Sequence, residues 1–584
     1  MTNDKLEKAI LVVAWVLIGL ALAAFVGYLL VYTIYAVELF RFPFDYDQGE
    51  GFELMDTVLF SQGEWPYRDN DQYPFYSSNY PPLFHVVIVP LVWIFGPQYW
   101  TGRLVSFLGT LITAVAISYG VQRHIRRWWL AVLVGLAFLA SNYVYHVGPL
   151  FRQHMFMVMF ETLAVVWLTM TIDKEERDGR TYPKRLLVVM LLLLAAGYTK
   201  QLAYATVVAV FIFLFIRHPK RAILWAIPFA AVTGLIFLWI NWATDGYWFL
   251  NTVTANINPF VPGQAQGLYR QWFNLHTLLV VTAVIYAIYQ LYFERLSAYS
   301  IWFVVAAVNS VTAGKWGAGE SYFATAIAAS CILTGLAYGR VLNHLQNNQT
   351  TSQLSFRAKP SARGIPPGQP AQGDSSEDAS AASTQALGMT NKHYLGRWVY
   401  PLALVIVPLL FLWQAERLFH MPTHTPALAA VAQALGKPTE VWIAPQTSCS
   451  APRPLESIPY VDAAGISLLG RPPNVADTAA GKAIAAAIAQ GETAAFAEDA
   501  GFNFYIGRDV ITNPTQLLNL YNNNQVDLTE MLAMLDEQAF DTVVLRAQFY
   551  PPPVLDMIGQ RYETQELVQM NGFVYCIMRP RIGD

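Results

Sequence analysis

Long apolar runs separated by short polar segments fill most of the chain up to residue 415. Eleven of these runs are candidate membrane spans: 9–32, 103–121, 127–146, 155–171, 185–199, 201–216, 222–241, 272–292, 299–313, 321–338 and 398–415. A helix needs roughly 20 apolar residues to cross the hydrocarbon core of a bilayer, and about 17 still suffice. The pattern therefore predicts a mostly α-helical, polytopic membrane protein with about eleven transmembrane helices.

A further apolar run, 83–95, is predicted to lie on the membrane without crossing it. If it crossed, the basic cluster Arg123–Arg127 would face outward, against the tendency of Lys and Arg to remain on the cytoplasmic side. Pro81 and Pro82 suit the start of a short interfacial helix. Eleven spans with a cytoplasmic N-terminus make 40–102 the first external loop, carrying juxtamembrane helices.

The remaining segments divide the chain into domains. Residues 351–390 are rich in Ser, Ala, Gln, Pro and Gly, a composition that cannot bury a core, so 341–396 is predicted to be a disordered cytoplasmic linker. The last span, within 397–415, then follows the membrane domain 1–340. Residues 416–584 are predicted to form an extracytoplasmic α/β domain.

Three short patterns support that external domain. The segments DTVVLRA (541–547) and GFVYCIM (572–578) are typical of strands, and PVLDMIGQ (553–560) of a helix. Of the three cysteines, only Cys449 and Cys576 could share this compartment, and a disulfide between them stays open.

Composition agrees with a membrane protein and excludes one class of partner. The chain is 55% hydrophobic and 13% charged, against about 25% charged residues in soluble domains, and its mean hydropathy is +0.34. The net charge of -3 offers no basic surface, so nucleic acid is not an expected partner.

The predicted topology collects ionisable residues of both signs on the outer side of the membrane. The stretch FDYDQGEGFEL (44–54) directly follows the first span and carries Asp45, Asp47 and Glu50. The other residues placed on this side are His85, His146, Arg152, His154, Lys200, Lys315 and Glu320. Ionisable groups at the ends of membrane helices are costly and point to function. We expect a site that handles a negatively charged lipid headgroup beside catalytic carboxylates.

Other carboxylates are given structural interpretations. Glu53 and Asp56 are expected on the solvent side of a short helix, and Asp69 and Asp71 in a turn. Glu161 falls inside a span, where it must pair with another group or be neutral, and no role is assigned to it.

Four motifs carry a family resemblance. They are DYDQGEG (45–51), NYPPLFHVVIVPLVWIFGPQYWTGRLVSFL (79–108), GYTKQLAY (197–204) and GKWGAGESYF (314–323). In this order and on one side of the membrane, they resemble the C-type (GT-C) membrane glycosyltransferase superfamily, especially bacterial relatives of the protein O-mannosyltransferases and of the lipid A aminoarabinose transferase. The resemblance covers roughly residues 9–340.

The resemblance implies that a sugar moves from a polyprenyl phosphate to an acceptor hydroxyl on a lipid, glycan or protein. Asp47 would be the base, and Asp45 and Glu50 would orient the acceptor. A divalent cation, Mg or Mn, would bind Asp47 and Glu50 if one takes part. The residues expected to bind the donor phosphate are Arg152, Lys200 and Lys315. The residues expected to contact substrate are His85, His154, Tyr80, Glu320 and Tyr322. Relatives often carry an acidic residue just after the counterpart of Arg152, whereas here Gln153 follows it.

Two other functions stay open. One is a transporter or flippase for a lipid or sugar, which would place ionisable residues near the membrane midplane in two repeated halves. The other is a non-catalytic membrane assembly protein that acts through residues 416–584. The sugar, which could be a hexose or a pentose, is not identified by the sequence.

Overall fold

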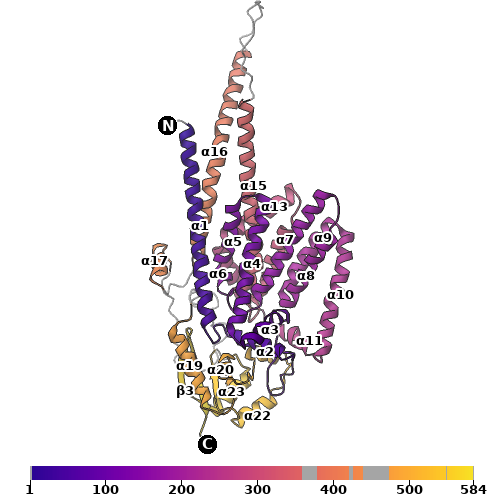
Figure 1. Cartoon of the computed structure of the whole chain (residues 1–584), viewed down its shortest axis with the longest axis vertical. Helices are drawn as coiled ribbons and strands as arrows, with labels where there is room; N and C mark the ends of the chain where they lie inside the picture. Colours follow the sequence, from indigo (N-terminus) through magenta and orange to yellow (C-terminus); the bar gives the residue numbers. More distant parts are fainter. Residues whose placement is uncertain (1–2, 358–377, 420–424, 438–471, 547–548, 583–584) are drawn as a thin grey trace, which may run out of the picture.

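The computed structural model describes residues 3–357, 378–419, 425–437, 472–546 and 549–582. Most of the chain forms a helical bundle, with a small mixed domain at one end (Figure 1). The bundle consists of α1 (Asn3–Arg41), α4 (Tyr99–Ile125), α5 (Trp128–Ala140), α6 (Asn142–Tyr145), α7 (His154–Asp178), α8 (Pro183–Thr199), α9 (Tyr204–Arg217), α10 (Pro219–Ala243), α13 (Thr277–Phe293), α14 (Ala298–Asn309), α15 (Ala324–Arg357) and α16 (Asp378–Leu418).

Each of the eleven predicted spans overlaps at least one helix, so the predicted multi-pass helical architecture is confirmed. Six of the described helices are long and apolar enough to cross a membrane. A seventh span results if α13 and the preceding α12 (Pro262–Leu275), bent by 92° at their junction, are counted as one. Helices α5, α9 and α14 are apolar but shorter, so the count of eleven stays a prediction.

Helix α7 lies in the interior of the bundle, packed against α4 and α8. It carries Glu161, whose carboxylate accepts hydrogen bonds from Thr206 (2.6 Å) and Thr325 (2.7 Å) on α9 and α15. These two hydroxyls satisfy the partner requirement that the sequence implied for a carboxylate inside a span.

Helices α15 and α16 form a long pair that extends beyond the bundle, at the end opposite the mixed domain (Figure 1). Both helices enter the stretch 341–396 that composition marked as a linker. Near its other end α16 packs along α1, where the Tyr28 hydroxyl donates to the Ala415 carbonyl oxygen (2.5 Å). The N-terminal helix is therefore held by a helix almost 400 residues later.

Two short helices lie at the end of the bundle that meets the mixed domain (Figure 1). They are α2 (Glu50–Ser61) and α3 (Leu83–Phe95), which pack on one another through Leu54, Phe84 and Ile88. Pro82 is the residue before α3, as expected for the proline-led run 83–95. A further short helix, α11 (Tyr247–Thr252), lies at the same end.

The C-terminal domain is built on one four-stranded sheet with the order β1-β2-β4-β3. Its elements are α17 (Pro426–Ala434), α19 (Val475–Ala489), β1 (Phe496–Ala497), α20 (Gly501–Tyr505), α21 (Pro514–Asn522), α22 (Thr529–Asp536), β2 (Val543–Leu545), α23 (Pro552–Arg561), β3 (Tyr562–Met570) and β4 (Phe573–Pro580). Strand β1 pairs parallel to β2, and β4 pairs antiparallel to both β2 and β3. The three patterns that predicted strand, helix and strand are confirmed as β2, α23 and β4.

The cysteines differ in state. Cys331 is free and buried, whereas Cys576 on β4 is disulfide-bonded. Cys449, the partner that the sequence left open for Cys576, lies outside the described residues.

Candidate active site

Arg103 fixes the turn between α1 and α2. Its guanidinium donates to the backbone oxygens of Leu39 (2.5 Å), Phe42 (2.6 Å) and Phe44 (2.8 Å), and it forms an ion pair with Glu50 (2.7 Å). Both side chains are 0% exposed. Arg103 belongs to the motif 79–108, but no sequence pattern indicated that it would neutralise a carboxylate of DYDQGEG.

Glu50 extends this network to the residues beside the site. Besides Arg103, it accepts hydrogen bonds from the backbone N–H groups of Tyr46 (3.0 Å), Asp47 (3.3 Å) and Phe151 (2.6 Å). Because one carboxylate holds the backbone of Asp47 and of the residue before Arg152, it sets the distance between them. These donors take up both oxygens of Glu50, so its metal role remains a prediction.

Asp47 and Arg152 form an ion pair at the centre of the site. Oδ2 of Asp47 lies 2.6 Å from Nη2 and 2.8 Å from Nε of Arg152, which is the two-nitrogen geometry of a strong charge-assisted contact. Although burial raises the pKa of Asp47, the charge and hydrogen bonds of Arg152 bring it below its usual value. The Asp47 side chain is still 41% exposed and the Arg152 side chain 24% exposed, so both can meet a ligand.

Gly49 makes room for this ion pair. A Cβ atom at position 49 would lie 2.1 Å from Nη1 and 2.2 Å from Nη2 of Arg152. A side chain here would force the guanidinium away from Asp47, which explains the glycine between the carboxylates of DYDQGEG.

Lys200 lies on the other side of Arg152, at the end of α8. Its Nζ is 4.9 Å from the centre of the Tyr80 ring and 5.4 Å from that of Tyr322, within the range of cation–π attraction. Burial, followed by the positive charge of Arg152, lowers the pKa of Lys200 to about 8. The His154 ring is 5.6 Å from that of Tyr322, so three of the predicted residues, Tyr80, His154 and Tyr322, gather around the Lys200 ammonium group.

Glu320 also belongs to the site, where it lies next to His146. Its carboxylate contacts Nε2 of His146, and the charges of both residues act on Asp47. Lys315, from the same motif as Glu320, has its backbone paired with Phe260. Within the described residues the Lys315 side chain forms no ion pair, so its phosphate-binding role remains a prediction.

Asp45 lies in the contact between the first loop and the C-terminal domain. Its two oxygens accept from the backbone N–H groups of Gly51 (2.6 Å) and Gly501 (2.7 Å) and from the Tyr99 hydroxyl (2.8 Å). Burial, followed by the charge of Asp499, raises the pKa of Asp45 to about 8. Asp45 is 1% exposed. These contacts suit a positioning role, and its catalytic role remains a prediction.

The C-terminal domain brings a cation that the sequence analysis missed. Arg546 follows β2, forms an ion pair with Asp499 (3.2 Å) and stacks over the Phe573 ring at 3.8 Å. Its charge is among those that lower the pKa of Asp47. The only sequence signal was an arginine at the end of the predicted strand 541–547. Its proximity to Asp47 arises only when the C-terminal domain packs on the first loop.

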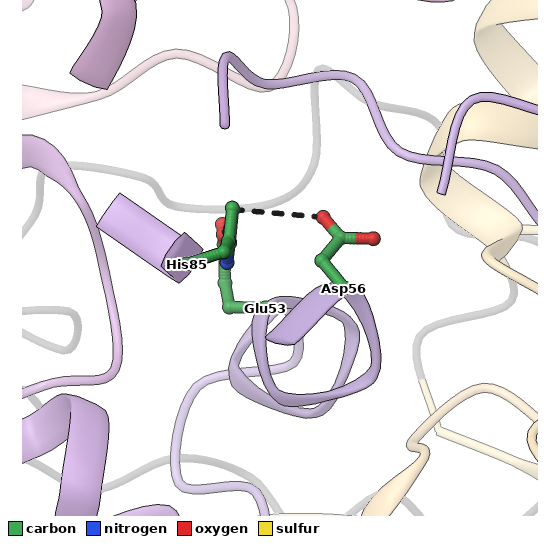
Figure 2. Close-up of side chains that lie close together, drawn as sticks. All are labelled: Glu53, Asp56 and His85. Carbon is green, nitrogen blue, oxygen red and sulfur yellow. Dashed lines mark ion pairs between the residues drawn. The ribbon is translucent and has the colours of Figure 1, made fainter. Parts of the chain in front are cut away.

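Glu53 and Asp56 correct one expectation. Both were placed on the solvent side of α2, but they are 2% and 3% exposed. They face His85 of α3, whose Nε2 lies 3.3 Å from Glu53 and 3.7 Å from Asp56 (Figure 2). The expectation was wrong because α3, the segment that carries Tyr76 and Ser78, and Arg152 cover the face of α2 that holds the two carboxylates.

The group formed by Glu53, Asp56 and His85 adjoins the Asp47–Arg152 pair. Nη1 of Arg152 lies 3.5 Å from Glu53, and with its amide nitrogen turned toward Glu53, Gln153 comes within 2.9 Å of Oε1. Burial raises the pKa of Glu53 to about 7, in spite of the Arg152 charge, and lowers that of His85 to about 3. His85 thus lies beside the site, and within the part of the chain that the structure describes it forms no hydrogen bond or ion pair with Asp47.

Comparisons with known proteins give matches in structure alone. No protein-family model matches the chain, and no curated protein does. The structure of ArnT from Cupriavidus metallidurans bound to undecaprenyl phosphate is similar over 96% of this chain and 98% of its own, with a TM-score of 0.53 and 14% identity. The apo state of that protein gives a TM-score of 0.52 and 15% identity, over 95% of this chain and 97% of its own.

A more distant match is the archaeal oligosaccharyltransferase AglB from Archaeoglobus fulgidus, in complex with an inhibitory peptide and a dolichol-phosphate. It covers 94% of this chain and 74% of its own, with a TM-score of 0.45 and 12% identity. The ArnT likeness extends over nearly the whole of both chains, membrane bundle and C-terminal domain together, and agrees with the order of motifs in the sequence. The chain therefore has the fold of ArnT.

Proposed function

We propose that the protein is an integral membrane glycosyltransferase. It would move a monosaccharide from a polyprenyl-phosphate donor to an acceptor hydroxyl on the outer side of the cytoplasmic membrane. The observation that carries this proposal is the partly exposed Asp47–Arg152 ion pair beside Lys200. It offers a carboxylate for a proton and two cations for a phosphate, in one place.

The chemistry is a displacement at the anomeric carbon. The acceptor oxygen bonds to that carbon while its proton passes to Asp47. The bond from the anomeric carbon to the phosphate oxygen breaks, and polyprenyl phosphate leaves as an anion. Arg152 and Lys200 stabilise the charge that collects on the leaving phosphate. Attack by the acceptor itself inverts the sugar, whereas a sugar–carboxylate intermediate would retain its configuration.

Donor binding would also change the pKa of Asp47, because Asp47 and the donor phosphate share Arg152. A lipid phosphate that accepts hydrogen bonds from Arg152 competes with Asp47 for the guanidinium. Because that guanidinium lowers the pKa of Asp47, its withdrawal raises the pKa and makes the carboxylate a better base. Donor binding would thus activate Asp47 for the acceptor that follows.

The lipid chain has a suitable surface next to Lys200. An open apolar groove of about 820 Å³ lies between α9 and α10, lined by residues 207–216 of α9 and 226–237 of α10. Helix α9 starts four residues after Lys200. A phosphate bound at Lys200 would therefore leave its polyprenyl tail beside this groove. We propose the groove as the path of the first isoprene units.

The C-terminal domain would complete the acceptor side. Gly501 donates to Asp45 of the first loop, and the Arg546 charge reaches Asp47. This domain is therefore part of the site's construction. A lipid, glycan or protein acceptor would approach between it and the Asp47 carboxylate.

The test uses purified full-length protein and an undecaprenyl-phosphate monosaccharide with a radiolabelled sugar. Sugar transfer and release of undecaprenyl phosphate are measured for the wild type, Asp47→Asn and Glu64→Gln. Glu64 is the matched control because it also forms an ion pair in the first external loop, with Arg68, and is 56% exposed. We expect Asp47→Asn to reduce turnover about 10²- to 10⁴-fold, the usual contribution of a general base, and Glu64→Gln to leave it unchanged.

Two results would overturn the proposal. Equal turnover by Asp47→Asn and the wild type removes Asp47 from the reaction. Absence of turnover with a panel of hexose and pentose donors, together with lipid flipping by the same protein in vesicles, would replace the enzyme with a flippase.

A further inference from the structure

We propose that Glu53, Asp56 and His85 form a binding site for one divalent cation of the zinc or manganese class, which fastens α2 to α3. The site lies beside the Asp47–Arg152 pair but shares no residue with it. Its existence does not depend on the proposed transferase activity.

The three side chains have the spacing of ligands to one ion. One ligand atom from each lies within 4.8 Å of the other two. The nitrogen-to-oxygen distances are 3.3 Å to Glu53 and 3.7 Å to Asp56. Ligands held about 2.1 Å from a tetrahedral zinc are about 3.4 Å from one another. Figure 2 shows the three side chains close together, with the His85 ring facing the Asp56 carboxylate.

His85 supplies the second observation. Its ring is 0% exposed, and Nε2 has no hydrogen-bond partner among the described residues. Nδ1 is 3.3 Å from the Thr57 hydroxyl, which already donates to the Glu53 backbone oxygen. Thr57 can therefore only accept from Nδ1, so Nδ1 carries the proton. The Nε2 lone pair then faces two carboxylate oxygens, an arrangement that a cation between them would stabilise.

The surrounding hydroxyls orient the ligands in the way expected around a metal. Asp56 accepts from Tyr76 (2.8 Å) and Ser78 (2.5 Å). Among the described residues no Lys or Arg forms an ion pair with Asp56, although its carboxylate is almost fully buried. A buried carboxylate without a cation is costly, and a bound ion would supply the missing positive charge.

The donor set selects the class of ion. One imidazole nitrogen with two carboxylates suits Zn²⁺ or Mn²⁺, whereas Mg²⁺ and Ca²⁺ prefer oxygen ligands alone. The ion would also affect the neighbouring site. Since Glu53 lies 3.5 Å from Arg152, a cation on Glu53 weakens its hold on the guanidinium, which then remains available to Asp47 and the donor.

The experiment measures metal content directly. Full-length protein, purified without a metal-affinity step, is stripped with a chelator, incubated with Zn²⁺ or Mn²⁺ alone at micromolar concentration, desalted and analysed for bound metal. We expect about one equivalent per chain and a higher melting temperature than the stripped protein, as for a site that couples metal binding to folding.

Three variants locate the ion. His85→Phe keeps a ring but removes the ligand nitrogen, and should lose the equivalent. Ser78→Ala leaves all three ligands and should weaken affinity about 10- to 100-fold, as for other partners of metal ligands. Glu161→Gln changes a buried carboxylate elsewhere in the protein and should bind like the wild type.

The outcomes separate this inference from the transferase proposal. A wild type that binds neither ion overturns the inference, and a protonated carboxyl group that donates to Nε2 of His85 would then take the place of the ion. Wild-type binding by both His85→Phe and Ser78→Ala also overturns it, because the ion would lie elsewhere. Neither readout involves turnover, so the transferase proposal stands or falls separately.

Discussion

The carboxylates of DYDQGEG divide into two kinds. Asp45 and Glu50 are at most 1% exposed and accept hydrogen bonds from backbone N–H groups. Asp47, between them, is 41% exposed, and among the described residues its carboxylate accepts hydrogen bonds from the Arg152 guanidinium alone. The flanking acids shape the loop, and the middle one is presented to the site. Neighbours in sequence with the same charge can therefore have opposite roles.

The largest effect should come from removing Arg103, which forms an ion pair with the buried Glu50. Arg103→Ala leaves Glu50 buried without its cation and frees three backbone oxygens, and should lower the free energy of unfolding by about 3–5 kcal/mol. Chemical unfolding in detergent would measure it. Arg41→Ala is the matched control, because the Arg41–Glu38 pair is largely exposed and such pairs contribute at most about 1 kcal/mol. Equal losses in the two variants would contradict the framework role of Arg103.

The next effect tests how closely Asp47 must face Arg152. Gly49→Ala places a Cβ inside the guanidinium's position, so Arg152 must move away from Asp47. We expect turnover to fall about 100-fold, the cost of a displacement near 1 Å in an active site. Gly19→Ala, where nothing lies within 4 Å of the added Cβ, should retain wild-type turnover. Full activity in Gly49→Ala would show that the ion pair is dispensable.

Asp45→Asn tests whether Asp45 holds the loop in place while Asp47 remains available to the substrate. Both oxygens of Asp45 accept from backbone N–H groups, so an amide must turn its NH₂ toward one of them. We expect a loss of about 1–3 kcal/mol in unfolding free energy, with easier proteolysis between the membrane and C-terminal domains. Asp47→Asn should change neither. A destabilised Asp47→Asn beside an unaffected Asp45→Asn would reverse the assignment.

The smallest effect is a pH dependence of donor binding, set by Lys200. The pKa of Lys200 is lowered to about 8, so its positive charge is present below that pH and is lost as the pH rises through it. The KM for the donor should therefore increase between pH 7 and pH 9 in the wild type. In Lys200→Arg, which keeps its charge, the increase should disappear. Parallel pH profiles would mean that another group sets the donor affinity.

The sequence was sufficient for features that depend on local pattern. The apolar runs became helices, the proline-led run 83–95 became α3, and the segments 541–547 and 572–578 became β2 and β4. The motifs GYTKQLAY (197–204) and DYDQGEG (45–51) were also brought to one end of the bundle. Each of these follows from periodicity, from helix-start chemistry or from the charge of loops.

The sequence was insufficient wherever a contact crosses between domains. The place of Arg546 depends on how β2 meets the first loop. Contacts between segments far apart in the membrane domain were missed as well. The burial of Glu53 and Asp56 depends on His85 of α3 and on Arg152. Arg103 has four acceptors, and all of them lie between Leu39 and Glu50, more than 50 positions earlier in the chain.

The hydrogen bond from Gly501 to Asp45 also has a consequence for biosynthesis. It joins residues 456 positions apart, so the first loop leaves the ribosome long before its partner exists. Until the C-terminal domain has been made, the acidic loop lacks the contact that holds it. The proposed activity should therefore be absent during insertion, and nascent chains halted before residue 501 should show no turnover while the membrane helices are already in place.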